Sequence, residues 1–181
     1  MIGDNYMQNK GFTLIEMVVA VAIFTLLVGT SSSIFLSSIK TQKQGLATQE
    51  ILDQTSYLME YMSRSLRMAK KDIAGACTGT AKLNYVFDDQ LPIKCLKFLN
   101  YKGTCQQFCQ EGTRLKDENS NYLTSANLQV SNFAVVLSGA IQPPTDYLQP
   151  RVTISFDIVG QEQTSIKVQT TVSQRNPDVR Q

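Results

Sequence analysis

The hydrophobic pattern of the chain begins with an apolar run near the N-terminus. Residues 12–39 contain one charged side chain, Glu16, and residues 17–28 are apolar except for Thr25. As an α-helix, these 28 residues would be about 42 Å long. A membrane hydrocarbon core is only about 30 Å thick. The pattern therefore predicts a helix that can span a membrane.

The pattern changes from continuous to striped beyond residue 40. Apolar side chains now recur every three or four positions, which is the spacing of an amphipathic helix. The stripe consists of Ile51, Thr55, Leu58, Met62, Leu66, Ala69 and Ile73. We therefore expect one helix from residue 12 to about residue 71. Residues 40–75 form its amphipathic continuation, which should pack on the rest of the chain.

The remainder of the chain has the β-branched content and alternation of strands. Strands are expected at 94–101, 104–110, 113–116, 128–138, 151–159 and 165–173. Residues 152–158 alternate strictly, so one face of the sheet should be buried, on the helix. A long helix followed by an antiparallel sheet is an α+β fold. We expect the β-rich domain to cover residues 76–176, followed by a tail at 177–181.

Composition limits the chemistry that is available. The 181 residues include no histidine, which removes Ser-His-Asp and Cys-His nucleophiles and most zinc sites. No phosphate-binding or dinucleotide motif is found. The net charge is +2, and the longest basic run is Lys70-Lys71, so no nucleic-acid partner is expected. The sequence predicts a protein that is not an enzyme and has no cofactor or metal.

Three interpretations of the N-terminal run compete: a secretory signal peptide cleaved near residues 30–33, a plain single-span anchor, and a processed filament signal. Glu16 distinguishes them. A carboxylate at the centre of a membrane helix costs about 2.5–3.5 kcal/mol, and a signal peptide or plain anchor has no use for it. A position of Glu16 at headgroup depth, where the cost is small, is the remaining structural explanation.

The residues around Glu16 favour the third interpretation. The run Lys10-Gly11-Phe12-Thr13-Leu14-Ile15-Glu16-Met17 resembles the N-terminal signature of type IV pilins and type II secretion pseudopilins. The resemblance implies that a prepilin peptidase cuts after Gly11 and N-methylates Phe12. It also implies that residues 1–11 are a cytoplasmic leader. Glu16 would then pair with the Phe12 amine of an adjacent subunit, so that two buried charges neutralise each other and fix the axial register.

The resemblance also implies a location and a fold. Residues 12–39 would first be a single-pass anchor in the bacterial inner membrane, with the N-terminus in the cytoplasm, and later the core of an extracytoplasmic filament. The fold would be pilin-like, a long helix packed on a C-terminal antiparallel sheet. The first proline is Pro92, whereas major pilins commonly carry one within this helix. Residues 29–33 are the natural place for a bend, or simply small residues for close helix packing.

Two functions from different classes follow. The first is a structural subunit, a minor pilin or pseudopilin of a type IV pilus-like or type II secretion filament, whose partners are the prepilin peptidase and other subunits. The missing helix proline and the large sheet domain favour the pseudopilin side. The second is an exported binding or adhesin domain that the same span merely anchors.

Export makes disulfides the expected state of the four cysteines, which are Cys77, Cys95, Cys105 and Cys109. A three-residue hairpin loop ending at Gly103 would pair Asn100 with Thr104, and therefore Cys95 with Cys109. That pair is a non-hydrogen-bonded one with Cα atoms about 4.5 Å apart, close enough for a bridge. Cys77 would then pair with Cys105.

Two points about the cysteines stay open. The alternative pairing, Cys77–Cys95 with Cys105–Cys109, requires the last two cysteines to lie on a helical turn, because strand residues four apart are about 13 Å apart. In addition, Leu96, Phe98 and Phe108 would lie on the sheet face opposite Cys95 and Cys109. If the phenylalanine face is the core, both bridges lie toward the surface.

Overall fold

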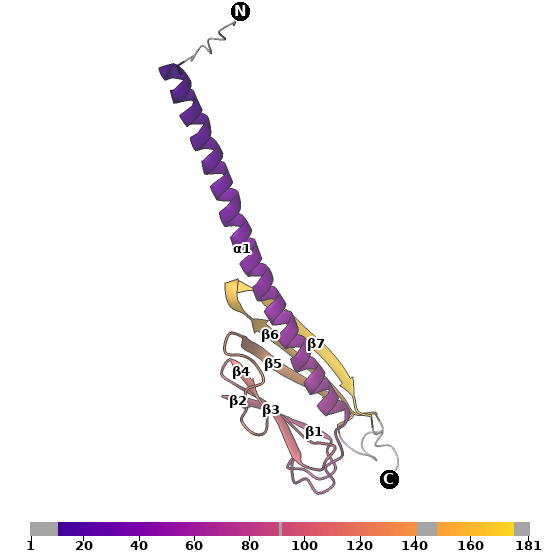
Figure 1. Ribbon diagram of the computed structural model, residues 1–181. Helices are drawn as coiled ribbons and strands as arrows, with labels where there is room; N and C mark the ends of the chain where they lie inside the picture. Colours follow the sequence, from indigo (N-terminus) through magenta and orange to yellow (C-terminus); the bar gives the residue numbers. More distant parts are fainter. Residues whose placement is uncertain (1–10, 91, 141–147, 176–181) are drawn as a thin grey trace, which may run out of the picture. The chain divides into compact units, whose positions relative to one another are not determined.

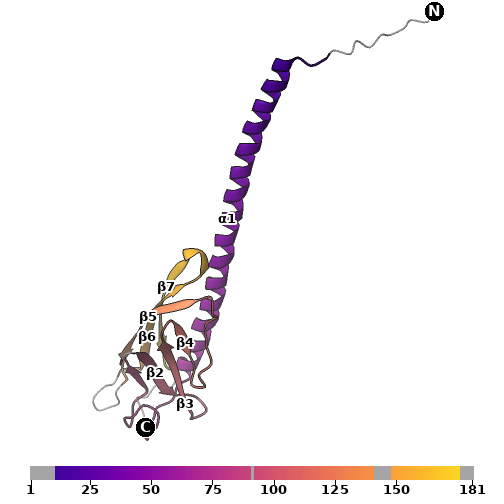
Figure 2. The ribbon, with the colours of Figure 1, turned by 90° about the vertical axis from the view of Figure 1, so that its left-hand side faces the viewer.

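The computed structural model describes residues 11–90, 92–140 and 148–175, with the backbone alone at residue 163. The chain divides into two units, Met1–Lys43 and Gln44–Gln181. The first contains the beginning of helix α1, and the second contains the rest of α1 and all the strands (Figures 1 and 2). A long N-terminal helix followed by antiparallel sheets confirms the predicted α+β, pilin-like fold.

Helix α1 covers Leu14–Arg67 without interruption, as the sequence predicted for most of this range. Its start has an identifiable cause. The Thr13 hydroxyl accepts a hydrogen bond from the Glu16 backbone N–H at 3.3 Å, and the Thr13 carbonyl accepts one from Met17 at 3.2 Å. Thr13 with Glu16 three residues later is the arrangement of a capping box. Glu16 therefore occupies the first turn, near the positive end of the helix dipole.

The helix ends at Arg67, and the expected end near residue 71 was wrong. Residues from distant segments form hydrogen bonds with the last carbonyl of the helix and with the backbone that follows it. The Arg175 N–H donates to the Arg67 carbonyl, the Gln174 side chain to the Ala69 carbonyl, and the Lys70 N–H to the Leu99 carbonyl, at 2.7–2.8 Å. These contacts lead the chain away from the helix axis. Ile73, the last residue of the expected stripe, is consequently 69% exposed.

The strands form two antiparallel sheets instead of one. The first has the order β1-β2-β3-β4, and the second the order β5-β6-β7. The strands are β1 (Tyr85–Asp88), β2 (Ile93–Leu99), β3 (Cys105–Glu111), β4 (Arg114–Lys116), β5 (Gln129–Ser138), β6 (Arg151–Val159) and β7 (Ser165–Ser173); a 3-10 turn, η1 (Gln161–Gln163), joins the last two. All six predicted strands are present, and β6 and β7 have the predicted bounds. β1 was not among the predicted strands.

One hydrophobic core joins α1 to both sheets. The buried face of α1 includes Ile51, Leu58, Met62 and Leu66, which are at most 1% exposed and belong to the predicted stripe. Aromatic side chains from the two sheets meet this face: Tyr85, Phe98, Phe108, Phe133 and Phe156. Burying each such apolar side chain contributes about 1.5–3 kcal/mol. The second unit therefore has a substantial core of its own, independent of the apolar N-terminal run.

A buried carboxylate organises the loop between α1 and β1. Asp72 is 2% exposed, and its Oδ1 accepts hydrogen bonds from the N–H groups of Gly75 and Ala76 at 2.9 and 3.2 Å. Its Oδ2 accepts hydrogen bonds from the N–H groups of Cys77 and Thr78 at 2.7 and 2.9 Å. Burial raises the pKa of the Asp72 carboxyl, but the donors at Thr78, Cys77 and Gly75 lower it more, so the pKa lies below its ordinary value. The loop that places Cys77 thus depends on this charge.

Asp72→Asn is expected to lower the free energy of unfolding by about 2 kcal/mol near neutral pH, because an amide has one acceptor oxygen where the carboxylate has two. A depressed folded pKa gives stability that is present above the unfolded pKa of about 3.9 and is lost as the pH falls through the folded pKa. The difference between the two proteins should therefore shrink as the pH falls below about 4.

Urea unfolding of the detergent-solubilised chain, followed by tyrosine fluorescence, measures this difference. Asp53→Asn is the matched control, because Asp53 is exposed on α1. An equal loss of stability in both variants, or a difference that persists in acid, would contradict the role given to Asp72.

Candidate functional site: an exposed apolar helix with one carboxylate

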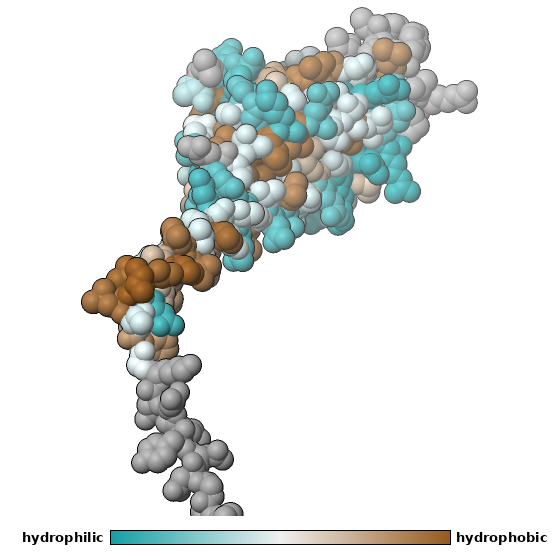
Figure 3. Space-filling view, turned by 90° about the horizontal axis from the view of Figure 1, so that it is seen from above, coloured by the Kyte–Doolittle hydropathy of each residue, from teal (hydrophilic) through white to brown (hydrophobic). Residues whose placement is uncertain are grey.

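The first candidate site is the surface of α1 within the N-terminal unit. Its apolar side chains are exposed from the start, for example Leu14 at 82% and Ile15 at 67%, and Phe12, two residues before the helix, is exposed at 77%. Figure 3 shows hydrophobic residues gathered over this segment. The helix is long and apolar enough to cross a membrane, and none of its most apolar window is buried within the chain. So much exposed apolar surface needs lipid or protein to cover it.

Glu16 is the only charged residue between Phe12 and Ile39. Its side chain is exposed, and it follows Phe12 by four positions. Phe12 itself precedes the first helical residue by two positions, so a chain beginning there would have its amine just outside the helix. The structure thus presents one carboxylate close to the end of a bare apolar helix. That group is costly to bury alone and favourable to bury against a cation.

The small polar residues within the span do not interrupt α1. The hydroxyls of Ser31 and Ser32 donate to carbonyls four residues earlier, each at 2.8 Å. Those of Thr30 and Ser33 likewise bond within the helix. Hydroxyls that bond back to their own helix leave no unsatisfied donor in an apolar surrounding. The segment is therefore compatible with a membrane or with tight helix packing, and α1 is continuous through it.

The second candidate site is the cysteine framework of the first sheet. Cys95 is joined to Cys109 with Cα atoms 4.1 Å apart, and Cys77 to Cys105 with Cα atoms 5.2 Å apart. These are the pairs that the hairpin register favours. The register itself is observed: Cys95 lies opposite Cys109, and the turn ends at Gly103 with φ +83°.

The bridges lie on the sheet face that points away from the core. Leu96, Phe98 and Phe108 are completely buried on the other face. The alternation of the strands then places the cysteines outside, as expected for a phenylalanine core. Cys95 and Cys109 are nevertheless only 9% and 7% exposed, whereas Cys105 is exposed. The Cys95–Cys109 bridge links the two strands of the β2–β3 hairpin, and the Cys77–Cys105 bridge links that hairpin to the Asp72 loop.

Comparison with known proteins agrees with the N-terminal geometry. Residues 6–32 match the family model described as the prokaryotic N-terminal methylation motif. This motif is the signal of type IV pilins and pseudopilins, which confirms the resemblance inferred from the sequence. It supports an exported subunit of the pilin or pseudopilin type and implies processing by a prepilin peptidase. No curated protein and no solved structure matches the chain.

Proposed function

We propose that this chain is a minor pilin or pseudopilin, a structural subunit of a type IV pilus-like or type II secretion filament. The observation that carries the proposal is the lone Glu16 carboxylate at the start of an apolar helix whose side chains are exposed. A plain anchor needs the apolar surface but has no use for the carboxylate. A helix that must leave lipid and join other helices in a fixed register uses both.

The proposed sequence of events begins in the inner membrane. Residues 12–39 span the bilayer with the leader, residues 1–11, in the cytoplasm. The peptidase cleaves after Gly11 and methylates the new amine of Phe12, which remains a cation. During assembly the apolar surface passes from lipid to neighbouring helices, and the Phe12 amine of one subunit meets the Glu16 carboxylate of the next. The pair neutralises both charges where water is absent.

The absence of a helix proline and the size of the sheet domain favour a minor pseudopilin within this class. The first proline is Pro92, which lies beyond α1. An uninterrupted helix keeps its exposed apolar surface continuous through this segment, which suits side-by-side packing. Secretion, adhesion, DNA uptake and motility filaments share this anchor, so the filament's task is not part of the proposal.

Cell fractionation tests this function. The full chain is expressed in cells that form such filaments, and sheared filaments are separated from membranes. We expect the shortened chain to appear in the filament fraction only when the prepilin peptidase is active. A chain that reaches the cell surface yet stays entirely with the membrane would support the anchored binding domain instead.

A further inference from the structure

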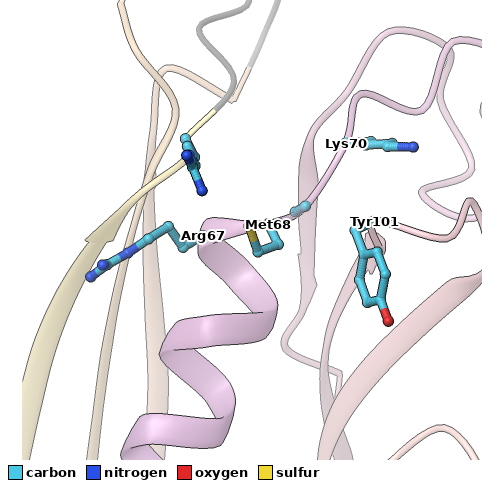
Figure 4. A pocket seen from close by; sticks show the side chains of 6 residues that line it. Arg67, Met68, Lys70 and Tyr101 are labelled. Carbon is cyan, nitrogen blue, oxygen red and sulfur yellow. The ribbon is translucent and has the colours of Figure 1, made fainter.

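A basic groove lies at the C-terminal end of α1. It consists of two adjoining hollows of about 330 and 300 Å³ that share Arg67, Met68 and Arg175. In Figure 4, the side chains of Arg67 and Met68 come from the end of α1, and that of Tyr101 comes from the turn between β2 and β3. We call this surface, which also includes Arg64 and Lys70, the basic groove.

Most cations of the basic groove have no acidic partner among the residues that the structure describes. Arg64 forms an ion pair with Glu60 on α1 at 2.5 Å. Arg67, Lys70 and Arg175 are exposed, and no ion pair involves them within the described part of the chain. Like charges held close together repel, and an anion placed among them relieves that repulsion. The groove is therefore prepared for an acidic partner.

Further cations lie at the same end of the C-terminal unit. The Lys70 N–H bonds to the Leu99 carbonyl, which brings the β2–β3 turn and Lys102 to the end of α1. The Gln174 N–H bonds to the Pro150 carbonyl, which brings Arg151, at the start of β6, to the same place.

The opposite end of this unit is acidic. The turn after β6 packs on Ile51, because a Cβ on Gly160 would lie 2.6 Å from the Ile51 side chain. This contact places Glu162 beside the first turns of α1 in this unit, where Asp53 is also exposed. Figure 1 shows the β6–β7 turn and the end of α1 at opposite ends of the unit.

Two cations toward the acidic end have acidic partners of their own, and a third lies opposite a carboxylate. Lys94 pairs with Asp89, and Lys116 pairs with Glu111. Lys167 lies opposite Asp157 in the pairing of β6 with β7. No ion pair involves Asp53 or Glu162 within the residues that the structure describes. Within the described residues, the unit therefore has an acidic end and a basic end, and several exposed charges at each end form no ion pair.

We propose that the basic groove docks the acidic end, centred on Asp53 and Glu162, of a second copy of this chain stacked with the same polarity. The inference rests on the proposed function, since it specifies a contact between filament subunits. A head-to-tail contact that does not close on itself generates an open filament. Opposite charges steer such a contact and fix its register. Exposed Met68 and Tyr101 at one end, and Leu46 and Tyr57 at the other, supply apolar area.

Site-specific photocrosslinking of the full chain tests this contact. A photoreactive phenylalanine analogue replaces Tyr101, and two differently tagged copies are expressed together in cells that assemble filaments. We expect crosslinks to the peptides that contain Asp53 or Glu162 of the other copy. Crosslinks to the other copy's own basic groove, to lipid or to nucleic acid would overturn the proposal.

Charge reversal is the second test of the head-to-tail contact. Arg67→Glu with Arg175→Glu in both copies should reduce the crosslink about tenfold, because like charges then face each other. Asp53→Lys with Glu162→Lys in both copies should do the same. In a rescue experiment, one chain carries the photoprobe with Arg67→Glu and Arg175→Glu, and the second chain carries Asp53→Lys and Glu162→Lys. The crosslink between these two chains should be restored. The matched control, Lys97→Glu in the middle of β2, should leave the crosslink unchanged.

The outcome separates this inference from the proposed function. Each sample is also checked for a shortened N-terminus and for presence in filaments. If processed chains enter filaments but the reversals have no effect, or the combined variants give no rescue, the head-to-tail contact is wrong while the subunit role stands. If no processed chain enters filaments, the proposed function itself is wrong.

Discussion

Replacing Glu16 with alanine is expected to reduce incorporation of the chain into filaments by about tenfold or more, while membrane insertion and leader cleavage continue. Without the carboxylate, the Phe12 amine of a neighbouring subunit would be buried unpaired. Breaking a buried ion pair by removing one partner costs about 3–5 kcal/mol, which is enough to exclude most copies from an assembly in competition with other subunits. Immunoblots of sheared filaments and of membranes measure the ratio.

Two further variants separate the charge from the local role of Glu16 in the helix cap. Glu16→Gln retains the backbone N–H that bonds to the Thr13 hydroxyl but removes the charge, so it should fail like alanine. Thr13→Ala removes that hydrogen bond and keeps the carboxylate, so it should assemble nearly normally if its leader is still removed. If filaments form normally with Glu16→Ala, or fail only with Thr13→Ala, assembly depends on the Thr13 cap and not on the Glu16 carboxylate.

Removing either disulfide is expected to have the largest effect on the stability of the C-terminal unit. The Cys95–Cys109 bridge has a sequence separation of 14 and the Cys77–Cys105 bridge one of 28. Loop-closure entropy predicts a loss of about 3 kcal/mol for the shorter loop and about 3.5 kcal/mol for the longer one. Paired replacements by alanine, measured by urea unfolding of the detergent-solubilised chain, test both values.

Peptide mapping without reduction accompanies this measurement, because it distinguishes the two possible pairings. We expect Cys77→Ala with Cys105→Ala to leave a peptide pair linked through Cys95 and Cys109. Linkage of Cys77 to Cys95 in the unmodified chain would contradict the framework. A stability loss well under about 1 kcal/mol for both pairs would show that the bridges do not restrain the unfolded chain as assumed.

The elements that the sequence predicts well are those fixed by local pattern. The apolar run before Lys40 has no other reasonable structure than a helix. β6 alternates strictly and β7 alternates in part, so their bounds follow from the pattern. The register of β2 and β3 follows from a short turn in which Gly103 adopts a positive φ.

Features that depend on distant contacts were not predictable in this way. α1 ends at Arg67 because distant residues form hydrogen bonds at its end. Arg175 bonds to Arg67, Gln174 bonds to Ala69, and Leu99 bonds to Lys70. The strands separate into two sheets, and the β5–β6 register shifts between Ser131 and Ala134. Neither feature follows from a periodic pattern in the sequence.

The same distinction holds for the candidate sites. The segment from Gly11 to Glu16 is contiguous, so its chemistry can be read directly from the sequence. The basic groove could not be found there, because Lys70, Tyr101 and Arg175 come from three separate parts of the chain. The only local signal was the run of cations at the end of the amphipathic helix, which is also common on solvated helix ends.

If this chain is a processed filament subunit, its mature N-terminus must have been cut and methylated. The full chain is expressed with an active prepilin peptidase, extracted from membranes, and subjected to intact mass measurement and N-terminal sequencing. We expect a chain that begins at Phe12 and has the mass of one additional methyl group. A chain that begins near Ser33 would instead establish a conventional signal peptide, and the chain would then not be a pilin-type subunit.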